Sequence, residues 1–370
     1  MERKTDKIRV GLITVHVGFN FGSILQTIAS SEAFRTLGCE VEVINYIPDR
    51  VTYKRYWKVA FSSLRNFIRK TLSLPIFIIN RHLYTGFLRK YVKLSPPIYT
   101  TDDFVEKCPR KDIYVTGSDQ VWNSKHNEGI DTRYFFTGID GECKISYASS
   151  IGQSHLSAEE KDVFRQALSG YSGISVREES AKQLLLEIGI PSLQLLDPTF
   201  ILDRSEWRKY MSDMTIKEPY LLVYAPYNIK DEEAIYTVAR KIARYKNLKV
   251  ITFSWSIVRN PKADKTVCFA SPGDFLRLMN DAAVVLTNSF HGTAFSINLN
   301  KQFWVFNPSA FSTRIESILK LLHLEDRLLM DGDLGNKQDS VIDFAPVNGI
   351  LQNERERAYA FLEKCIKKCI

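Results

Sequence analysis

A histidine at the start of a predicted helix, His291, is the side chain in this sequence best placed to do chemistry. It follows an apolar run at 283–286, which predicts a strand, and lies in the polar segment 288–293, before a second strand at 302–306. In open α/β sheets, ligands bind beyond the carboxyl ends of strands, and helix N-termini attract anions. We therefore predict that His291 meets a negatively charged substrate; a purely structural histidine is the alternative.

Two further charged side chains directly follow predicted strands. Arg177 comes after the strand at 173–176 and could offer a bidentate fork to a carboxylate or phosphate; pairing with Glu178, Glu179 or another carboxylate is the alternative. Asp119 comes after the strand at 112–116 and could orient or deprotonate a hydroxyl group. It could equally cap the next segment.

Other polar and aromatic side chains near strand ends are candidate ligand contacts. The turn at 18–23 ends at a predicted helix N-terminus, where amides would hold an anion or a hydroxyl, unless it is a plain connection. Trp122 offers a face for stacking on a sugar, with a place in the core as the alternative. Tyr227 and Asn228 follow a strand at 220–225. Secondary histidine candidates are His16, His126 and His155.

Metal and common cofactor signatures are absent from the sequence. It contains no GxGxxG after the first strand, no GxxxxGKS/T, no HExxH and no GxSxG. The DxD sequence at 331–333 has no strand before it, so we interpret it as a turn. The six cysteines include no CxxC pair and no histidine partner at zinc spacing, and we expect them to be free thiols in a reducing cytoplasm.

Six short segments, taken in order, form a specific pattern: 20–26 (NFGSILQ), 117–123 (GSDQVWN), 146–152 (SYASSIG), 175–180 (SVREES), 196–199 (LDPT) and 288–292 (NSFHG). Over about residues 8–307 this pattern resembles the polysaccharide pyruvyl transferases. The resemblance implies transfer of a pyruvyl group from phosphoenolpyruvate to a sugar, usually as a cyclic ketal across two hydroxyls. Many members carry Arg two residues before the histidine, where this chain has Ser289, so donor contacts must come partly from elsewhere.

For such a reaction, His291 would either donate a proton to the methylene carbon of phosphoenolpyruvate or bind the departing phosphate, and Asp119 would act on an acceptor hydroxyl. We expect donor contacts from Arg177, Asn288, Ser289, Thr293, Tyr227 and Asn228. We expect acceptor contacts from Asn20, Ser23, Gln26, Ser118, Gln120 and Trp122. Phosphoenolpyruvate is a co-substrate, and neither a cofactor nor a metal is expected.

The predicted acceptor is a lipid-linked precursor of a bacterial surface polysaccharide, carrying a hexose such as galactose. Two other functions stay open at this point. A GT-B glycosyltransferase using a nucleotide sugar would want an acidic residue for the ribose, and no clear Glu-x7-Glu pattern is present. A non-catalytic membrane- or carbohydrate-binding relative is the second, because Ser289 departs from the family pattern.

The elements that must position these residues alternate between strand and helix along almost the whole chain. At 370 residues the chain exceeds what one core usually holds. We predict an α/β fold of two doubly wound Rossmann-like domains facing a cleft, similar to the GT-B architecture. The expected domains are 1–205 on the acceptor side and 216–345 on the donor side, with a C-terminal helix at 350–370 that packs back across the boundary.

A basic segment at 51–95 interrupts the first domain. From 51 to 101 the chain has ten Lys or Arg and no Asp or Glu, and 54–72 forms one amphipathic face on a helical wheel. We predict that 54–72 binds an anionic membrane, which would place the protein in the cytoplasm, peripheral to the inner face of the cell membrane. The alternative is that its apolar face covers the N-terminal sheet. No nucleic-acid motif accompanies the charge, and nucleic acid is not an expected partner.

Overall fold

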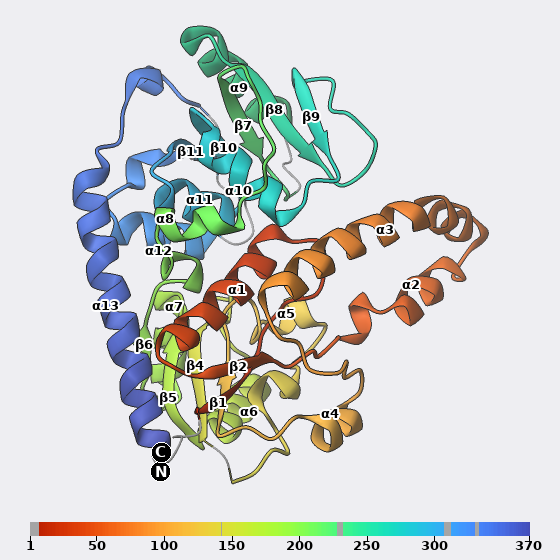
Figure 1. The fold of residues 1–370 in the computed structure, drawn as a ribbon, viewed down its shortest axis with the longest axis vertical. Helices are drawn as coiled ribbons and strands as arrows, with labels where there is room; N and C mark the ends of the chain where they lie inside the picture. Colours follow the sequence, from red (N-terminus) through yellow and green to blue (C-terminus); the bar gives the residue numbers. More distant parts are fainter. Residues whose placement is uncertain (1–6, 142, 228–231, 307–311, 330–332) are drawn as a thin grey trace, which may run out of the picture. The chain divides into compact units, whose positions relative to one another are not determined.

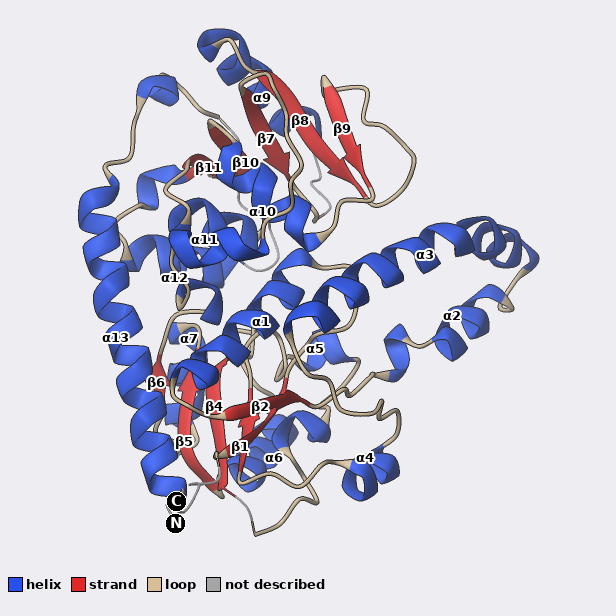
Figure 2. Cartoon of the chain, viewed as in Figure 1, coloured by secondary structure: helices blue, strands red, loops and turns tan. Residues whose placement is uncertain are grey.

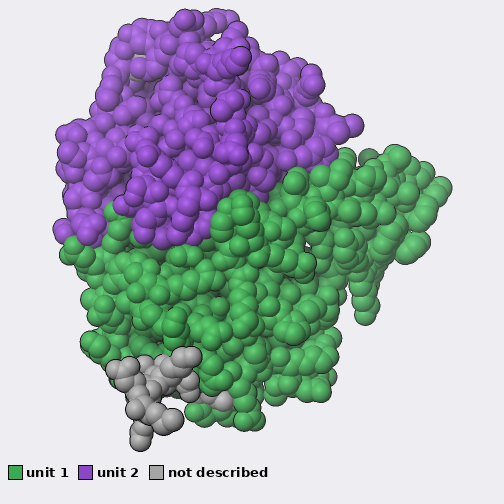
Figure 3. Space-filling view, viewed as in Figure 1, with its two compact units in different colours: residues 1–201, 354–370 green, residues 202–353 purple. Residues whose placement is uncertain are grey.

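The computed structural model describes residues 7–141, 143–227, 232–306, 312–329 and 333–370 (Figures 1 and 2). The chain forms two compact units, coloured separately in Figure 3. Unit 1 comprises Met1–Ile201 with Glu354–Ile370, and unit 2 comprises Leu202–Asn353. Asn228 and part of the predicted turn at 331–333 lie outside the described residues.

Unit 1 is built on a six-stranded parallel sheet with the order β2-β1-β3-β4-β5-β6. The strands are β1 Arg9–Ile13, β2 Glu40–Val43, β3 Ile113–Thr116, β4 Cys143–Ser149, β5 Tyr171–Val176 and β6 Leu193–Gln194. The chain passes from β1 outward to β2 and then adds β3 on the other side of β1. The order therefore reverses between β1 and β3, the kind of point at which open parallel sheets bind ligands.

Unit 1 also contains helices, and its sheet is buried on both faces, as expected for parallel strands. Val10, Leu12 and Ile13 of β1 have no exposed surface. The helices are α1 Phe21–Thr36, α2 Tyr53–Ala60, α3 Leu64–Tyr91, α4 Thr101–Lys107, α5 Ser124–Asn127, α6 Ala158–Leu168 and α7 Glu179–Glu187. An unbroken buried sheet leaves only the strand ends and the loops for chemistry.

Unit 2 repeats the architecture with the strand order β12-β11-β10-β7-β8-β9, again all parallel. Its strands are β7 Tyr220–Tyr224, β8 Lys249–Ser254, β9 Lys265–Cys268, β10 Val284–Thr287, β11 Gln302–Phe306 and β12 Leu328–Leu329. Its helices are α8 Arg204–Trp207, α9 Glu232–Lys246, α10 Pro272–Asp281, α11 Phe290–Asn298 and α12 Ser312–Leu321. Here the order reverses between β7 and β10. The predicted α/β class with two doubly wound Rossmann-like domains is confirmed.

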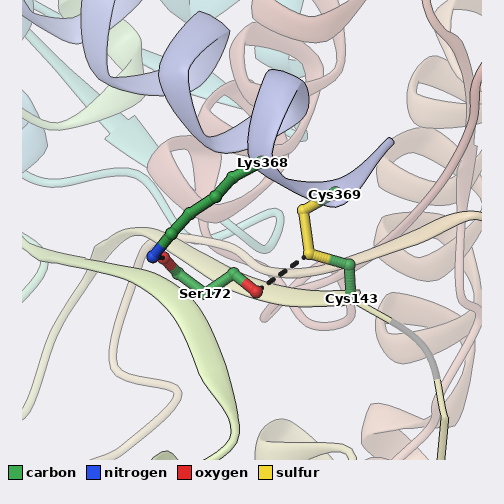
Figure 4. The surroundings of a disulfide bond; sticks show 4 residues. All are labelled: Cys143, Ser172, Lys368 and Cys369. Atoms are coloured by element: carbon green, nitrogen blue, oxygen red, sulfur yellow. Dashed lines mark hydrogen bonds between the residues drawn. A yellow bond between two sulfur atoms is a disulfide. The ribbon is translucent and has the colours of Figure 1, made fainter.

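The last helix, α13 Phe344–Cys369, begins in unit 2 and ends in unit 1. Gly173 of β5 allows its close approach, since a Cβ there would lie 2.3 Å from Cys365 Sγ. Near the end of α13, a disulfide joins Cys369 to Cys143 of β4, with 5.4 Å between the Cα atoms (Figure 4). The expectation that all six cysteines are free thiols is therefore wrong for this pair. Cys39, Cys268 and Cys365 are free thiols.

The basic segment forms a helical hairpin of α2 and α3 that extends away from the sheet of unit 1 (Figure 1). The single helix predicted over 54–72 is wrong, because the chain turns after Ala60 and Ser63 caps α3 by accepting a hydrogen bond from Asn66 N at 3.2 Å. Tyr56 ties the two helices together, donating from its hydroxyl to Lys70 O at 2.6 Å. Leu64 and Leu72 remain 75% and 74% exposed, so these side chains do not cover the sheet.

Candidate active site

His291 lies in the first turn of α11, which is separated from the end of β10 by two residues. The predicted order of strand, polar turn, helix and parallel strand is thus confirmed, and it falls at the switch point of unit 2. The imidazole is 3% exposed, and its ring centroid is 5.2 Å from that of Phe290. A buried titratable ring at a helix N-terminus lies in a positive field that favours a bound anion beside it.

Gly292 allows α11 to begin this close to the sheet. A Cβ at this position would lie 2.1 Å from Thr287 Oγ1 and 2.9 Å from Tyr224 Cδ1, so any side chain would push the helix away. Thr287 in turn joins the neighbouring strand ends: its hydroxyl donates to Tyr224 O at 2.6 Å and accepts from Ser289 N at 3.0 Å. These contacts hold the start of α11, and with it His291, against β7 and β10.

Asn288 and Thr293 differ in which hydrogen-bonding groups remain available to a ligand. The Thr293 hydroxyl donates to Ser289 O at 3.0 Å, a bond within the first turn of the helix. Asn288 is 2% exposed, and its Nδ2 donates to Tyr227 O at 2.9 Å. Its Oδ1 is buried and accepts no hydrogen bond from any described residue. An acceptor in that state suits a hydroxyl or a protonated group of a ligand.

Arg314 is a buried cation near α11 that the sequence patterns did not single out. It lies in α12, is 3% exposed, and its guanidinium carbon is 5.7 Å from the ring centroid of Phe290. Arginine is the side chain best suited to carboxylates and phosphates. Arg314 is therefore a candidate for the anion contact that Ser289 cannot supply. In the sequence, Arg314 is marked only as an arginine within a helix that has an apolar face.

A cavity of about 210 Å³ opens beyond the carboxyl ends of β7 and β8 in unit 2. Tyr227 contributes to its wall, so this predicted contact does face a ligand-sized space. Burial raises the pKa of the neighbouring Tyr224, which keeps that phenol protonated. The polar and aromatic lining includes Tyr224, Tyr227, Glu232, Tyr236, Trp255 and Asn260.

In unit 1, Arg177 forms ion pairs with carboxylates. This was the alternative to a ligand contact in the sequence analysis. Its Nη1 is 2.5 Å from Asp197 Oδ2, and its other nitrogens lie 3.8 Å from Asp119 and 3.9 Å from Glu178. Burial alone would disfavour the charged guanidinium, but the three carboxylates outweigh it and raise the pKa of Arg177 above its ordinary value. One cation among three carboxylates makes this region unfavourable for a donor that is itself anionic.

Asp119 occupies the switch point of unit 1, 6% exposed, with a φ of +69°. Aspartate adopts the left-handed region more readily than most non-glycine residues, because its short side chain can hydrogen-bond to the local backbone. Its Oδ1 accepts from Gln120 N at 2.9 Å and its Oδ2 from Ser23 Oγ at 2.5 Å. Asn20 caps α1, accepting from Gly22 N at 2.9 Å. The structure thus joins Asp119 and Ser23, while Asn20 has a structural task.

The remaining predicted acceptor contacts are buried, and one is contradicted. Trp122 is 2% exposed and stacks on Phe135 with 5.4 Å between ring centroids, so it belongs to the core and offers no face to a sugar. Ser118 donates to Asp197 Oδ2 at 3.0 Å, and Gln120 Oε1 accepts from Asn123 at 2.6 Å. Gln26 donates to Thr14 Oγ1, but its own Oε1 accepts nothing from any side chain or amide described.

The three secondary histidines are dispersed. His126 and His155 are exposed on the surface of unit 1. His16 is buried just beyond β1 and lines a second cavity, of about 310 Å³. Burial lowers the pKa of His16, although hydrogen bonds with Thr14 O and Asn45 act in the opposite direction.

The two doubly wound units define the class of the protein: a GT-B-like α/β scaffold. Solved structures with this fold include a protein assigned as a UDP-N-acetylglucosamine 2-epimerase from Listeria monocytogenes (9% identity, 96% of this chain and 90% of that chain, TM-score 0.50). Arabidopsis thaliana UGT89C1 complexed with quercetin matches at 11% identity over 99% and 100% of the two chains (TM-score 0.50). The N-terminal domain of Candida albicans trehalose-6-phosphate phosphatase matches at 9% over 98% and 97% (TM-score 0.50). At these identities the likeness establishes the fold alone.

Within this class the sequence decides the family. The family model for polysaccharide pyruvyl transferase matches residues 20–309, most of the chain. The protein belongs to the polysaccharide pyruvyl transferase family, as the six ordered segments predicted, and it is a transferase of polysaccharide biosynthesis. No curated protein matches it significantly.

Proposed function

We propose that this protein transfers the pyruvyl group of phosphoenolpyruvate to a hexose, such as galactose, of a lipid-linked surface-polysaccharide precursor, forming a cyclic ketal and releasing phosphate. The observation that carries the proposal is His291, a buried imidazole in the first turn of α11 at the switch point between β7 and β10. Family membership supports pyruvyl transfer as the reaction, and the position of His291 supports its proposed role as a proton donor or phosphate ligand beside a bound anion.

The chemistry requires one proton on the methylene carbon of the donor and the loss of phosphate. Protonation of that carbon gives an oxocarbenium-like centre at C2, to which one sugar hydroxyl adds; the second hydroxyl then displaces phosphate from the same carbon. The two hydroxyl protons balance the methyl group formed and the phosphate released. His291 serves as the acid or as the phosphate ligand. Asp119, which accepts a hydrogen bond from Ser23, is the proposed group for orienting an acceptor hydroxyl.

Donor binding in this proposal combines the α11 amides with Arg314 and Asn288. Arg314 is buried close to Phe290. In this proposal its guanidinium takes the role of the arginine that many family members carry at the position of Ser289. Asn288 Oδ1, in the loop between β10 and α11, is the buried acceptor proposed to receive a hydrogen bond from the donor. We leave Arg177 out of the donor set, because its carboxylate neighbours would repel phosphoenolpyruvate.

The α2–α3 hairpin is the proposed membrane contact. Phe61 is 71% exposed and Leu64 75%, next to the cations Lys58, Arg65 and Lys70, none of which forms an ion pair in the described part of the chain. Apolar side chains flanked by unneutralised cations match the interface of an anionic bilayer, at the inner face of the cell membrane. No described helix has the length and hydropathy to span a membrane.

The decisive experiment is incubation with phosphoenolpyruvate and candidate lipid-linked oligosaccharides, followed by mass spectrometry of the acceptor. We expect a pyruvyl ketal together with one phosphate released for each acceptor modified. Thermal stabilisation by phosphoenolpyruvate, and not by nucleotide sugars, would accompany it. Stabilisation by a nucleotide sugar together with glycosyl transfer would replace the proposal with a glycosyltransferase. Binding without turnover of any acceptor would favour a non-catalytic relative.

The proposed reaction uses no metal or organic cofactor, because phosphoenolpyruvate carries both the reactive double bond and the leaving group. Treatment with EDTA should leave the rate of phosphate release unchanged. A loss that a divalent cation restores would show this expectation to be wrong.

A further inference from the structure

A second cavity lies in unit 1, beyond the carboxyl ends of β1 and β2 and alongside α3. Its volume is about 310 Å³. The polar and aromatic side chains that matter here are His16, Asn45, Tyr53, Arg81, His82 and Arg89. Every ionic side chain in this lining is basic, and no Asp or Glu contributes to it. Such a wall favours an anionic ligand.

The two arginines of this cavity are not neutralised by carboxylates. Arg81 Nη1 donates to Val51 O at 3.3 Å, and its guanidinium lies 4.6 Å from the ring centroid of Tyr53. Neither Arg81 nor Arg89 has an ion pair with any residue that the structure describes. Both project from one face of α3, because positions 81 and 89 are about two helical turns apart. Their donors are thus available to one ligand.

His16 provides a buried polar group in the same wall. It is 3% exposed, with Nδ1 at 3.0 Å from Thr14 O and Nε2 at 3.1 Å from Asn45 Oδ1. Because a carbonyl oxygen only accepts, Nδ1 carries a hydrogen and the ring orientation is set. His16 is therefore held rigidly beside the two arginines, in a pocket built of elements from the sheet and from α3.

The surface that continues from this cavity along the hairpin is apolar. Ile78 lines the cavity and is 47% exposed, Ile79 is 42% exposed, and Leu72 one to two turns further on is 74% exposed. Figure 1 shows α3 running from the sheet of unit 1 toward the tip of the hairpin. A cationic pocket at the base of an apolar strip matches a molecule with an anionic head and a hydrocarbon tail.

We propose that this pocket binds the phosphate or diphosphate group that joins the acceptor sugar to its lipid carrier, with the start of the hydrocarbon chain lying along α3. The inference rests on the proposed function for its lipid-linked acceptor. Four arginine or histidine side chains and a space of about 310 Å³ suit a phosphorylated head group. The bound lipid would hold the sugar end of the acceptor near the switch point of unit 1, to which His16 and Asp119 both belong.

The test measures binding of farnesyl diphosphate to the full-length protein by calorimetry. Arg89→Ala removes an exposed cation and should weaken binding about tenfold, since a charge-assisted hydrogen bond is lost. Lys90→Ala, at the next position of α3 but outside the cavity, is the matched control and should bind as the unmodified protein does. Farnesol should bind far more weakly. Equal binding by Arg89→Ala, or by farnesol, would overturn the proposal.

Two competitors separate the possible sources of the phosphate. Phosphoenolpyruvate and phosphatidylglycerol vesicles should each fail to displace farnesyl diphosphate; displacement by the first would assign the pocket to the donor, and by the second to bulk lipid, and either would refute the inference. These readouts need no turnover, so they stand if pyruvyl transfer is absent. If transfer occurs, Arg89→Ala should raise the KM for a lipid-linked acceptor and leave a water-soluble acceptor unaffected; an unchanged KM would refute the pocket but not the function.

Discussion

The switch points of the two units have the same topology, but they differ in the charge of the side chains around them. In unit 1, Asp119 follows β3 at the switch point and belongs, with Arg177 beyond β5, to a buried network of one cation and three carboxylates. In unit 2, between β7 and β10, the loop residues are neutral amides and hydroxyls around His291. Unit 2 keeps a buried acceptor, Asn288 Oδ1, without a partner in the described structure.

This difference separates residues that hold the scaffold from residues that can meet an anion. Where acidic side chains outnumber cations, an anionic donor is repelled; where a helix N-terminus and a buried guanidinium converge, it is attracted. Charged side chains after a strand are therefore not equivalent candidates. Arg177 stands in one of the six family segments, but its carboxylate partners are those of a structural residue. Arg314 stands outside these segments and lies near α11.

The largest effect is expected at His291. His291→Ala should lower the rate of phosphate release from phosphoenolpyruvate by about 100- to 10,000-fold, the range of general acid–base catalysis. Stopped assays of released phosphate would measure it, with circular dichroism and thermal melting as the check on folding. Turnover near the rate of the unmodified protein would remove His291 from the mechanism and reverse the assignment of chemistry to unit 2.

Breaking the charge network of unit 1 should affect stability rather than chemistry first. Arg177→Met leaves Asp119, Glu178 and Asp197 buried without their cation, and we expect a loss of about 3–5 kcal/mol in the free energy of unfolding. Urea titration would measure this. A variant with unchanged stability but a raised KM for phosphoenolpyruvate would instead return Arg177 to the donor site.

The close approach of α11 to the sheet gives an intermediate effect. Gly292→Ala places a Cβ 2.1 Å from Thr287 Oγ1, and the resulting shift of the helix should cost about 1–3 kcal/mol and displace His291. Gly86→Ala in α3 is the matched control, because a Cβ there has nothing within 4 Å; it should be neutral or stabilising. Thermal melting of both variants compares them directly. Equal melting temperatures would mean that α11 tolerates the displacement.

The smallest effect concerns the hairpin. Leu72→Asp should reduce binding to anionic vesicles about tenfold, since burial of a leucine contributes about 2 kcal/mol. Val341→Asp changes an exposed apolar side chain of unit 2, 69% exposed, and should bind vesicles normally. Vesicle cosedimentation with phosphatidylglycerol measures both. Retention of binding by Leu72→Asp would leave the hairpin without a role at the membrane.

Much of the fold and part of the site followed from local patterns. Short apolar runs ending in small polar residues predicted the central strands of both sheets, and the run before His291 predicted β10 and the start of α11. Hydrogen bonding within helices and alternation of strand and helix act over a few residues, so spacing reveals them. The hairpin was predicted less well, because the spacing of its apolar residues fits one helix as well as two. The structure shows that Ser63 caps α3 and so begins a second helix.

The sequence by itself determined the α/β class, the family and the location of His291 after a strand, since these depend on residue order and short-range periodicity. Tertiary structure alone decided which charges meet. Arg177 and Asp197 are 20 positions apart and Cys143 and Cys369 are 226 apart, and both pairs form because the fold brings their elements together. Side-chain partners depend on which strands and helices become neighbours, a choice made by burial of the whole core and invisible to any local window.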